Sequence, residues 1–329
     1  MPFPLQSIPD SALKHIFRCM TPLELLAISV LSTKLSGLVK SLKIRANRLD
    51  ITLEKNVTIE EVFQNGRLVF SFPNAGPNGL DEKPLDIQIS DYFDFVDSVW
   101  TDPRIKLRTF LECILKNFEW YWDGIQLCFW TEHEILNTET LSKCFVSVTD
   151  TIIGHPCSAE YAEKIQKYFG PVTKNMDIYD DLFRQHSSSF VQSLAISNYD
   201  KLHFPDIRHG TLENLLTFNA ESIQICRPSF TQIVVNRFIK LWMKGCNSRL
   251  KIFDIEFSMK NEIYDQNVVL KGIKYKEIRE EVERQFVGWP RRRQVIKGGY
   301  DIKNRNGRRA TVHMNQMGIE LRILLLVWD

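Results

Sequence analysis

The chain lacks a charge excess, a long apolar run and a secretion signal, and each absence narrows the classes of function. Its 329 residues carry 42 Lys and Arg against 40 Asp and Glu, so no net charge favours nucleic acid or a membrane surface. The longest apolar run, Ile323 to Trp328, is far too short to span a bilayer. No basic start followed by an apolar stretch opens the chain, so no signal peptide is expected.

The cysteines also lack a pattern. Seven of them are scattered without a Cys-x-x-Cys pair, which predicts reduced thiols and an intracellular location, in the cytoplasm, the nucleus or both. The nearest approach to a metal cluster is Cys144, His155 and Cys157, and these are better explained as loop residues. Phosphate-binding loops and the common hydrolase, zinc-protease and kinase motifs are missing as well. We therefore expect no enzyme activity, no cofactor and no metal.

What the chain does contain is a strong helical pattern in its first forty residues. Leu13, Ile16, Phe17 and Met20 follow the spacing of one apolar helix face, and Pro9 is expected in the first turn of that helix. Thr21, Pro22 and Glu24 form a capping-box pattern that predicts the start of a second helix. A third helix is expected from Leu35, Leu38, Val39 and Leu42. Three helices in so few residues form only a marginal core, so one face should pack against something else, for which a protein partner is the natural candidate.

This segment resembles an F-box, the adaptor-binding motif of cullin-RING ubiquitin ligases, over residues 3 to 44. The pattern comprises Leu5, Ile8-Pro9-Asp10, Leu13, Ile16-Phe17, Pro22-Leu23, Leu26, Leu31-Ser32 and Leu38. The tryptophan that many F-boxes carry in the third helix is replaced by Thr33-Lys34-Leu35. The resemblance implies binding to a Skp-type adaptor, and through it to a cullin. The adaptor-contacting residues that it implies are Leu5, Pro9, Leu13, Phe17, Pro22, Leu23 and Leu26, with Leu13 and Phe17 as the expected hot spots.

A second resemblance covers the later part of the chain. The phrase from Asn236 to Gly245 (Asn-Arg-Phe-Ile-Lys-Leu-Trp-Met-Lys-Gly) is similar to the type-2 F-box-associated domain of nematode F-box proteins. The flanking stretches 194–200, 215–225 and 249–250 and the C-terminal segment from Asp301 to Trp328 extend this similarity. Together, the two regions imply a non-catalytic substrate receptor of a Skp–cullin–F-box ubiquitin ligase, with an unidentified target protein.

The expected fold is α+β or α/β, with a three-helix F-box followed by a leucine-rich-repeat-like domain of short strands and helices. Residues 1–45 form the F-box and 46–329 the substrate-recognition region, with the F-box-associated domain at about 186–258 and a strand and hairpin segment at 259–329. Leu194, Ile223 and Ile252 are expected in strands at intervals of 29 residues, which favours a repeat over an ordinary crossover sheet. Strands are also expected at 49–53, 68–72, 85–89, 125–129, 176–178 and 321–327. Helices are expected at 107–118, 158–169 and 234–242, the last closed by Gly245, and a hairpin at Asn306-Gly307.

Two features leave alternatives open. A basic stretch within 291–309 fits a solvated hairpin, and less well an RNA-binding or phosphopeptide-binding surface or a nuclear-import signal. The aromatic residues Phe118, Trp120, Tyr121 and Trp122 fit a core better than a recognition pocket. The alternatives to a ligase receptor are therefore an F-box module that acts without a cullin, or an RNA-associated protein.

Overall fold

A computed structural model of the chain describes residues 8–73, 79–81, 86–93, 96–101, 106–120, 124–179, 188–205, 207, 210–258, 265–288, 293–317 and 320–328. The chain divides into two compact units. The first contains Met1–Thr151 and Pro156–Lys164, and the second contains Ile152–His155 and Ile165–Asp329. The division passes through strand β9 (Val148–Ile153) and helix α6 (Ala159–Phe169), and η2 (Gly170–Val172) follows in the second unit.

The first unit begins with the three predicted helices, α1 (Asp10–Phe17), α2 (Pro22–Ser29) and α3 (Thr33–Ser41). Pro9 is the N-cap residue of α1 and lies one position before the helix, not in its first turn. The capping box of α2 is present: the Thr21 hydroxyl accepts the Glu24 N–H at 3.3 Å, and the Glu24 carboxylate accepts the Thr21 N–H at 2.8 Å. The capping pattern therefore predicted the start of α2 correctly.

A sheet follows in the same unit, in the strand order β8-β2-β3-β4-β5-β6. Its neighbours are antiparallel except for the parallel pair β2 and β8. Helix α4 (Leu107–Asn117) packs on one face, where the ring of Phe110 lies 5.0 Å from that of Phe70 and 5.5 Å from that of Phe72. The strands are β2 (Arg48–Leu53), β3 (Val57–Val62), β4 (Arg67–Phe72), β5 (Asp86–Asp91), β6 (Val96–Thr101) and β8 (Ile125–Phe129), and the short helix α5 (Thr138–Ser142) follows.

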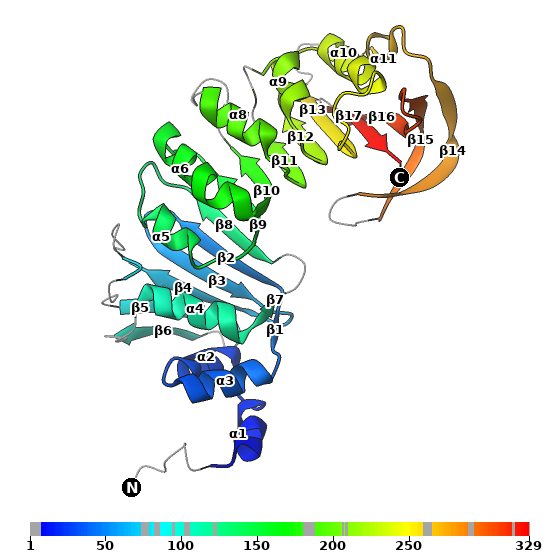
Figure 1. Cartoon of the computed structure of the whole chain (residues 1–329). Helices are drawn as coiled ribbons and strands as arrows, with labels where there is room; N and C mark the ends of the chain where they lie inside the picture. The colour runs from blue at the N-terminus through cyan, green and yellow to red at the C-terminus, as the bar shows by residue number, and fades with distance from the viewer. Residues whose placement is uncertain are drawn as a thin grey trace. The chain divides into compact units, whose positions relative to one another are not determined.

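The second unit contains four parallel strands with helices on one side of them (Figure 1). Apolar side chains fill the space between helices and strands, and the ring of Phe238 stacks on that of Phe253 at 4.0 Å. The parallel strands are β10 (Thr173–Ile178), β11 (Lys201–Phe204), β12 (Ser222–Cys226) and β13 (Ile252–Ser258). The helices are α8 (Ser188–Ile196), α9 (Leu212–Thr217), α10 (Gln232–Met243) and the short α11 (Gln266–Leu270).

An antiparallel group continues this sheet from β13 in the order β17-β16-β15-β14. The predicted turn at Gly307 is present with φ +85°, and the Asn304 carboxamide oxygen accepts the N–H groups of Asn306 and Arg308 at 3.0 and 2.9 Å. The strands are β14 (Lys276–Val287), β15 (Arg293–Lys303), β16 (Arg309–Met317) and β17 (Glu320–Val327). Sequence analysis missed β14, because its side chains are mostly polar and exposed on both faces.

The structure does not clearly show the predicted leucine-rich-repeat-like arrangement. Leu194 lies in helix α8 and not in a strand, because Phe190, Leu194 and Ala195 occupy one buried helix face. Ile223 and Ile252 do lie in the neighbouring parallel strands β12 and β13, but the parallel strands begin at unequal intervals, so the structure does not support a regular period of 29 residues. The F-box helices are instead followed by a sheet-rich mixed fold. Most of the other predicted elements are confirmed, although Leu85 lies outside the described residues.

The end of α10 explains one part of the F-box-associated phrase. Gly245 has φ +99°, and its N–H donates to the Trp242 carbonyl at 2.8 Å. The Cys246 N–H donates to the Leu241 carbonyl at 3.1 Å, which completes a Schellman motif. The Asn236 carboxamide at the middle of the helix donates to the carbonyls of Val269 and Lys271, at 2.7 and 3.0 Å, and so fastens α11 to α10. These residues therefore end α10 and attach α11 to it.

Candidate functional site

The three N-terminal helices share a small apolar core. Leu13 is 1% exposed and Phe17 is fully buried, so both expected hot spots lie inside this core. Leu26 is also fully buried. A side chain without surface cannot touch a partner while the helices stay folded, so these three residues would act by holding the helices in place. The buried cluster comprises Leu13, Phe17, Leu25, Leu35, Leu38 and Val39, with Ile8, Met20, Ile28, Leu42 and Ile44 packed around it.

The helices also pack against the rest of the first unit. Helices α2 and α3 both contact α4. The buried Ser36 hydroxyl donates to the Asn117 carboxamide oxygen at 2.9 Å. Strand β1 (Arg45–Ala46), directly after α3, pairs in parallel with β7 (Glu119–Trp120). The apolar face that sequence analysis assigned to a protein partner is therefore covered in part by the same chain.

Other apolar side chains of these helices remain on the surface. Ile16 is 44% exposed and Leu31 is 74% exposed. Of the other predicted contact residues, Pro9 is exposed, and Pro22 and Leu23 are half-buried, whereas Leu5 lies outside the described residues. Helical spacing placed Ile16 on the same face as Leu13 and Phe17, and it could not reveal which residues of that face α3 covers. The exposed apolar positions were therefore missed as contact candidates.

The second unit brings together a thiol, an imidazole and a carboxylate. The Cys226 sulfur lies 3.9 Å from Nε2 of His203, and Nδ1 of His203 lies 3.3 Å from a carboxylate oxygen of Asp177. This order is that of a nucleophile, a base and an orienting group. However, burial, with smaller effects of Glu256 and Asp254, raises the pKa of the Cys226 thiol to about 11. The thiol is therefore protonated at neutral pH, unlike the low-pKa thiols of typical reactive cysteines.

The expectation about metals concerned Cys144, His155 and Cys157. No group of three or more His, Cys, Asp or Glu side chains in the described part of the chain is arranged to hold a metal ion. All seven cysteines are free thiols. No helix among the described residues combines the length and apolar content needed to cross a bilayer.

The basic stretch within 291–309 takes part in holding the fold. The Arg308 guanidinium donates to the carbonyls of Ser248 and Leu250, and the Arg305 N–H donates to the Met243 carbonyl. Lys297 pairs with Glu283 at 2.7 Å. Arg291 and Arg292 lie outside the described residues. The described part of the stretch thus supports the hairpin interpretation and offers no particular support for RNA binding.

Of the predicted aromatic cluster, too, only part lies within the described residues. Phe118 is buried and meets the rings of Phe63 and Trp120 edge-on at 5.5 and 6.3 Å. Tyr121 and Trp122 lie outside the described residues. The described members therefore extend the core of the first unit.

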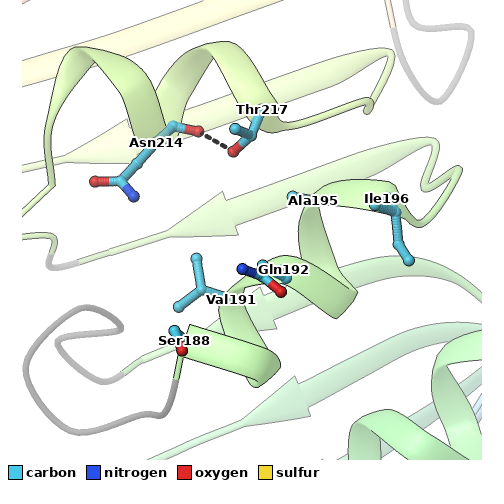
Figure 2. Close-up of a pocket in the computed structure, with 7 residues that line it drawn as sticks. All are labelled: Ser188, Val191, Gln192, Ala195, Ile196, Asn214 and Thr217. Atoms are coloured by element: carbon cyan, nitrogen blue, oxygen red, sulfur yellow. Dashed lines mark hydrogen bonds between the residues drawn. The ribbon is translucent and has the colours of Figure 1, made fainter.

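A pocket of about 640 Å³ lies between α8 and α9 in the second unit. The lining residues include Val191, Ala195 and Ile196 of α8 and Asn214 and Thr217 of α9, and Figure 2 shows the Ile196 side chain directed away from α9. The polar groups of α9 are already engaged, because Asn214 forms the capping box with Thr211 and the Thr217 hydroxyl donates to the Asn214 carbonyl at 2.7 Å. The described residues of the pocket present mainly apolar surface, and none of them is a Cys, His, Asp, Glu, Lys or Arg.

Comparison with known proteins identifies two segments. Residues 5–47 match the F-box domain family and residues 191–255 match the F-box associated family. The F-box associated domain-containing protein sdz-33 of Caenorhabditis elegans is 22% identical over 288 residues, which cover 86% of this chain and 88% of that protein. No solved structure matches the chain. The chain thus carries an F-box and an F-box-associated segment, as the sequence resemblance predicted, and this combination is typical of non-catalytic substrate-adaptor proteins.

Proposed function

We propose that this protein is the substrate-receptor subunit of a Skp–cullin–F-box ubiquitin ligase. The observation that carries the proposal is a folded F-box whose apolar core is closed while Ile16 and Leu31 stay on its surface. Exposed apolar side chains next to a closed core favour docking of a protein partner. The partner of residues 1–45 is then a Skp-type adaptor, which connects the chain to a cullin.

The contact residues follow from exposure. Of the contact residues that the resemblance implied, three are at least partly exposed: Pro9, Pro22 and Leu23. We add the exposed Ile16 and Leu31 to them. Leu5 falls within the F-box match and is retained as a contact residue. Leu13, Phe17 and Leu26 support the contact indirectly, because they hold the helices that carry it.

The remainder of the chain, residues 46–329, would bind the target protein. It includes the F-box-associated domain at about 186–258 and the strand and hairpin segment at 259–329. The protein itself performs no chemistry in this scheme. It raises the effective concentration of a target lysine beside a charged ubiquitin-conjugating enzyme, in the cytoplasm or nucleus.

The test is co-purification of the full chain with a purified Skp-type adaptor, followed by addition of a cullin. The double variant Ile16→Ser and Leu31→Ser removes apolar surface without opening the core. Burial of such side chains contributes about 1 kcal/mol or more each, so the affinity for the adaptor should fall at least about tenfold.

The matched control is Val146→Ser, because Val146 lies in the same unit and is 96% exposed. This variant should bind the adaptor as the unaltered chain does. Equal binding by the double variant and the control would refute the proposed contact surface. Failure of the unaltered chain to bind any Skp-type adaptor would refute the proposed function.

A further inference from the structure

One face of the parallel strands in the second unit has no helix on it among the described residues. Helices α8, α9 and α10 lie on the other side of these strands (Figure 1). The strand register aligns Asp177 with His203, His203 with Gln224, and Gln224 with Asp254 across β10 to β13. A second row, two residues further along the strands, contains Cys226, Glu256 and Arg322. Because residues two apart point to the same side of a strand, both rows lie on the helix-free face.

The hairpin of β14 and β15 covers one end of this face, at strands β13 and β17. Phe286 and Ile296 of the hairpin pack with Leu324 and Leu326 of β17, and the half-buried Ile252 joins them. Ile252 precedes Asp254 by two residues and Leu324 pairs with Asp254, so the hairpin covers the face on which the polar rows lie. The covered end is apolar and the uncovered part is polar.

Gly298 and Gly299 allow the backbone of β15 to adopt the conformation that the hairpin requires. They have φ values of +64° and +101°, and the register between β14 and β15 shifts between Ile278 and Glu283. A Cβ on Gly299 would lie 2.8 Å from the Thr311 methyl group. Only glycine fits this position without strain.

Most charges on the uncovered part are compensated locally. Asp177 lies 3.5 Å from the Lys201 ammonium group and 3.3 Å from the His203 ring. Arg322 binds both carboxylate oxygens of Asp254, at 2.8 and 2.6 Å. Glu256 is the register neighbour of Arg322 and, after Asp254, adds to the upward shift of the Arg322 pKa, although it forms no ion pair with any residue that the structure describes. Burial is the main cause of the upward shift of the Cys226 pKa, and the charges of Glu256 and Asp254 add to it while Arg227 and Arg322 oppose it.

We propose that this helix-free face binds an extended segment of the target protein, and that a Lys or Arg side chain of this segment pairs with Glu256. The inference rests on the proposed function, since it identifies the surface and the kind of target that the receptor takes. A cation is favoured because, among the described charges of the two rows and Lys201, three carboxylates (Asp177, Asp254 and Glu256) face two cations (Lys201 and Arg322), which leaves an excess negative charge. Gln224 and the exposed Tyr179 ring on the same face supply hydrogen-bonding and apolar contacts for the rest of the segment.

The test uses two libraries of randomised seven-residue peptides, one with a fixed central Lys or Arg and one with a fixed central Met. Both are passed over the immobilised full chain in low and physiological salt. We expect about tenfold enrichment of the cationic library, and loss of this enrichment in Glu256→Gln. The control is Glu281→Gln, which makes the same change at an exposed position on β14 and should leave the enrichment intact.

A charge-reversal variant distinguishes a loss of binding from a folding defect. Glu256→Lys should select peptides with a central Asp or Glu from a third library, a gain that an unfolded protein cannot produce. Equal recovery of the Lys or Arg and Met libraries, or enrichment that survives in Glu256→Gln, would overturn the inference. Adaptor binding is measured on the same variants and should not change. Failed peptide selection with intact adaptor binding therefore rejects this inference alone, whereas lost adaptor binding by the unaltered chain rejects the proposed function.

Discussion

A buried carboxyl group in the first unit should make the stability of this protein strongly dependent on pH. Glu61 of β3 is fully buried between Leu49 of β2 and Leu68 of β4. Neither of its carboxylate oxygens has a hydrogen-bond partner among the described residues. Burial raises the pKa of Glu61 to about 8, from an ordinary value of 4.5. The folded protein therefore holds a neutral Glu61 at pH 7, whereas the unfolded chain has an ionised one.

The sign and the magnitude follow from proton linkage. Since the folded pKa is the higher one, the folded state binds the extra proton, and its stability is lost as the pH rises from about 4.5 to about 8. With about 1.4 kcal/mol per pKa unit, the free energy of unfolding should fall by about 3 to 4 kcal/mol between pH 5 and pH 8. This is a large share of the total stability, roughly 5–15 kcal/mol for a typical protein.

The variant Glu61→Gln removes the titrating group and nearly keeps its shape. We expect the free energies of unfolding of the variant and the unaltered chain to agree near pH 5 and to diverge until the variant is about 3 to 4 kcal/mol more stable at pH 8. Urea unfolding followed by circular dichroism at several pH values measures this difference. Titration of all other groups cancels in the comparison. The control Glu54→Gln alters an exposed glutamate of the same unit and should give no such divergence.

The result that refutes this reasoning is a constant difference between Glu61→Gln and the unaltered chain from pH 5 to pH 8. A variant that is less stable at pH 8 would refute it as well, because it would mean that Glu61 is ionised and stabilised in the fold.

Two further predictions concern the cores of the two units. Phe17→Ala should destabilise the F-box helices by about 3–5 kcal/mol, because it empties the centre of a small core, and thermal unfolding with adaptor binding should show both losses together. Loss of adaptor binding without destabilisation of the F-box helices would contradict the buried position of Phe17. Asn236→Ala should cost about 1–3 kcal/mol, because it leaves the carbonyls of Val269 and Lys271 without their shared donor. The Asn236→Ala effect is measured by urea unfolding, and an unchanged midpoint would contradict it.

Sequence analysis predicted best where local chemistry decides the structure. The capping box at Thr21, the Schellman glycine at 245 and the turn at Gly307 each fix the backbone through neighbours in the chain. The prediction at Leu194 was wrong because a short apolar run fits a helix face and a buried strand equally well. Strand β3 was missed because Glu61 interrupts its apolar alternation.

The candidate site was harder to predict for a different reason. Helical spacing shows which residues of α1 share a face, but the packing of α3 against α1 decides which of them stay on the surface. Ile16 and Phe17 are neighbours in the chain and differ completely in exposure. The polar rows of the second unit left no trace in the sequence, because only the register of parallel strands aligns Asp177, His203 and Gln224.

The hydrogen bond between Ser36 and Asn117 has a consequence for how modular this protein is. Excision of residues 1–45 would separate Ser36 from its hydrogen-bond partner Asn117 and strand β1 from its partner β7, and would remove the contacts of α2 and α3 with α4. The F-box of this chain is therefore not an independent module that could be transferred to another receptor without loss of stability. Exchange of this segment between proteins would have to include α4 and β7, which lie more than sixty residues further along the chain.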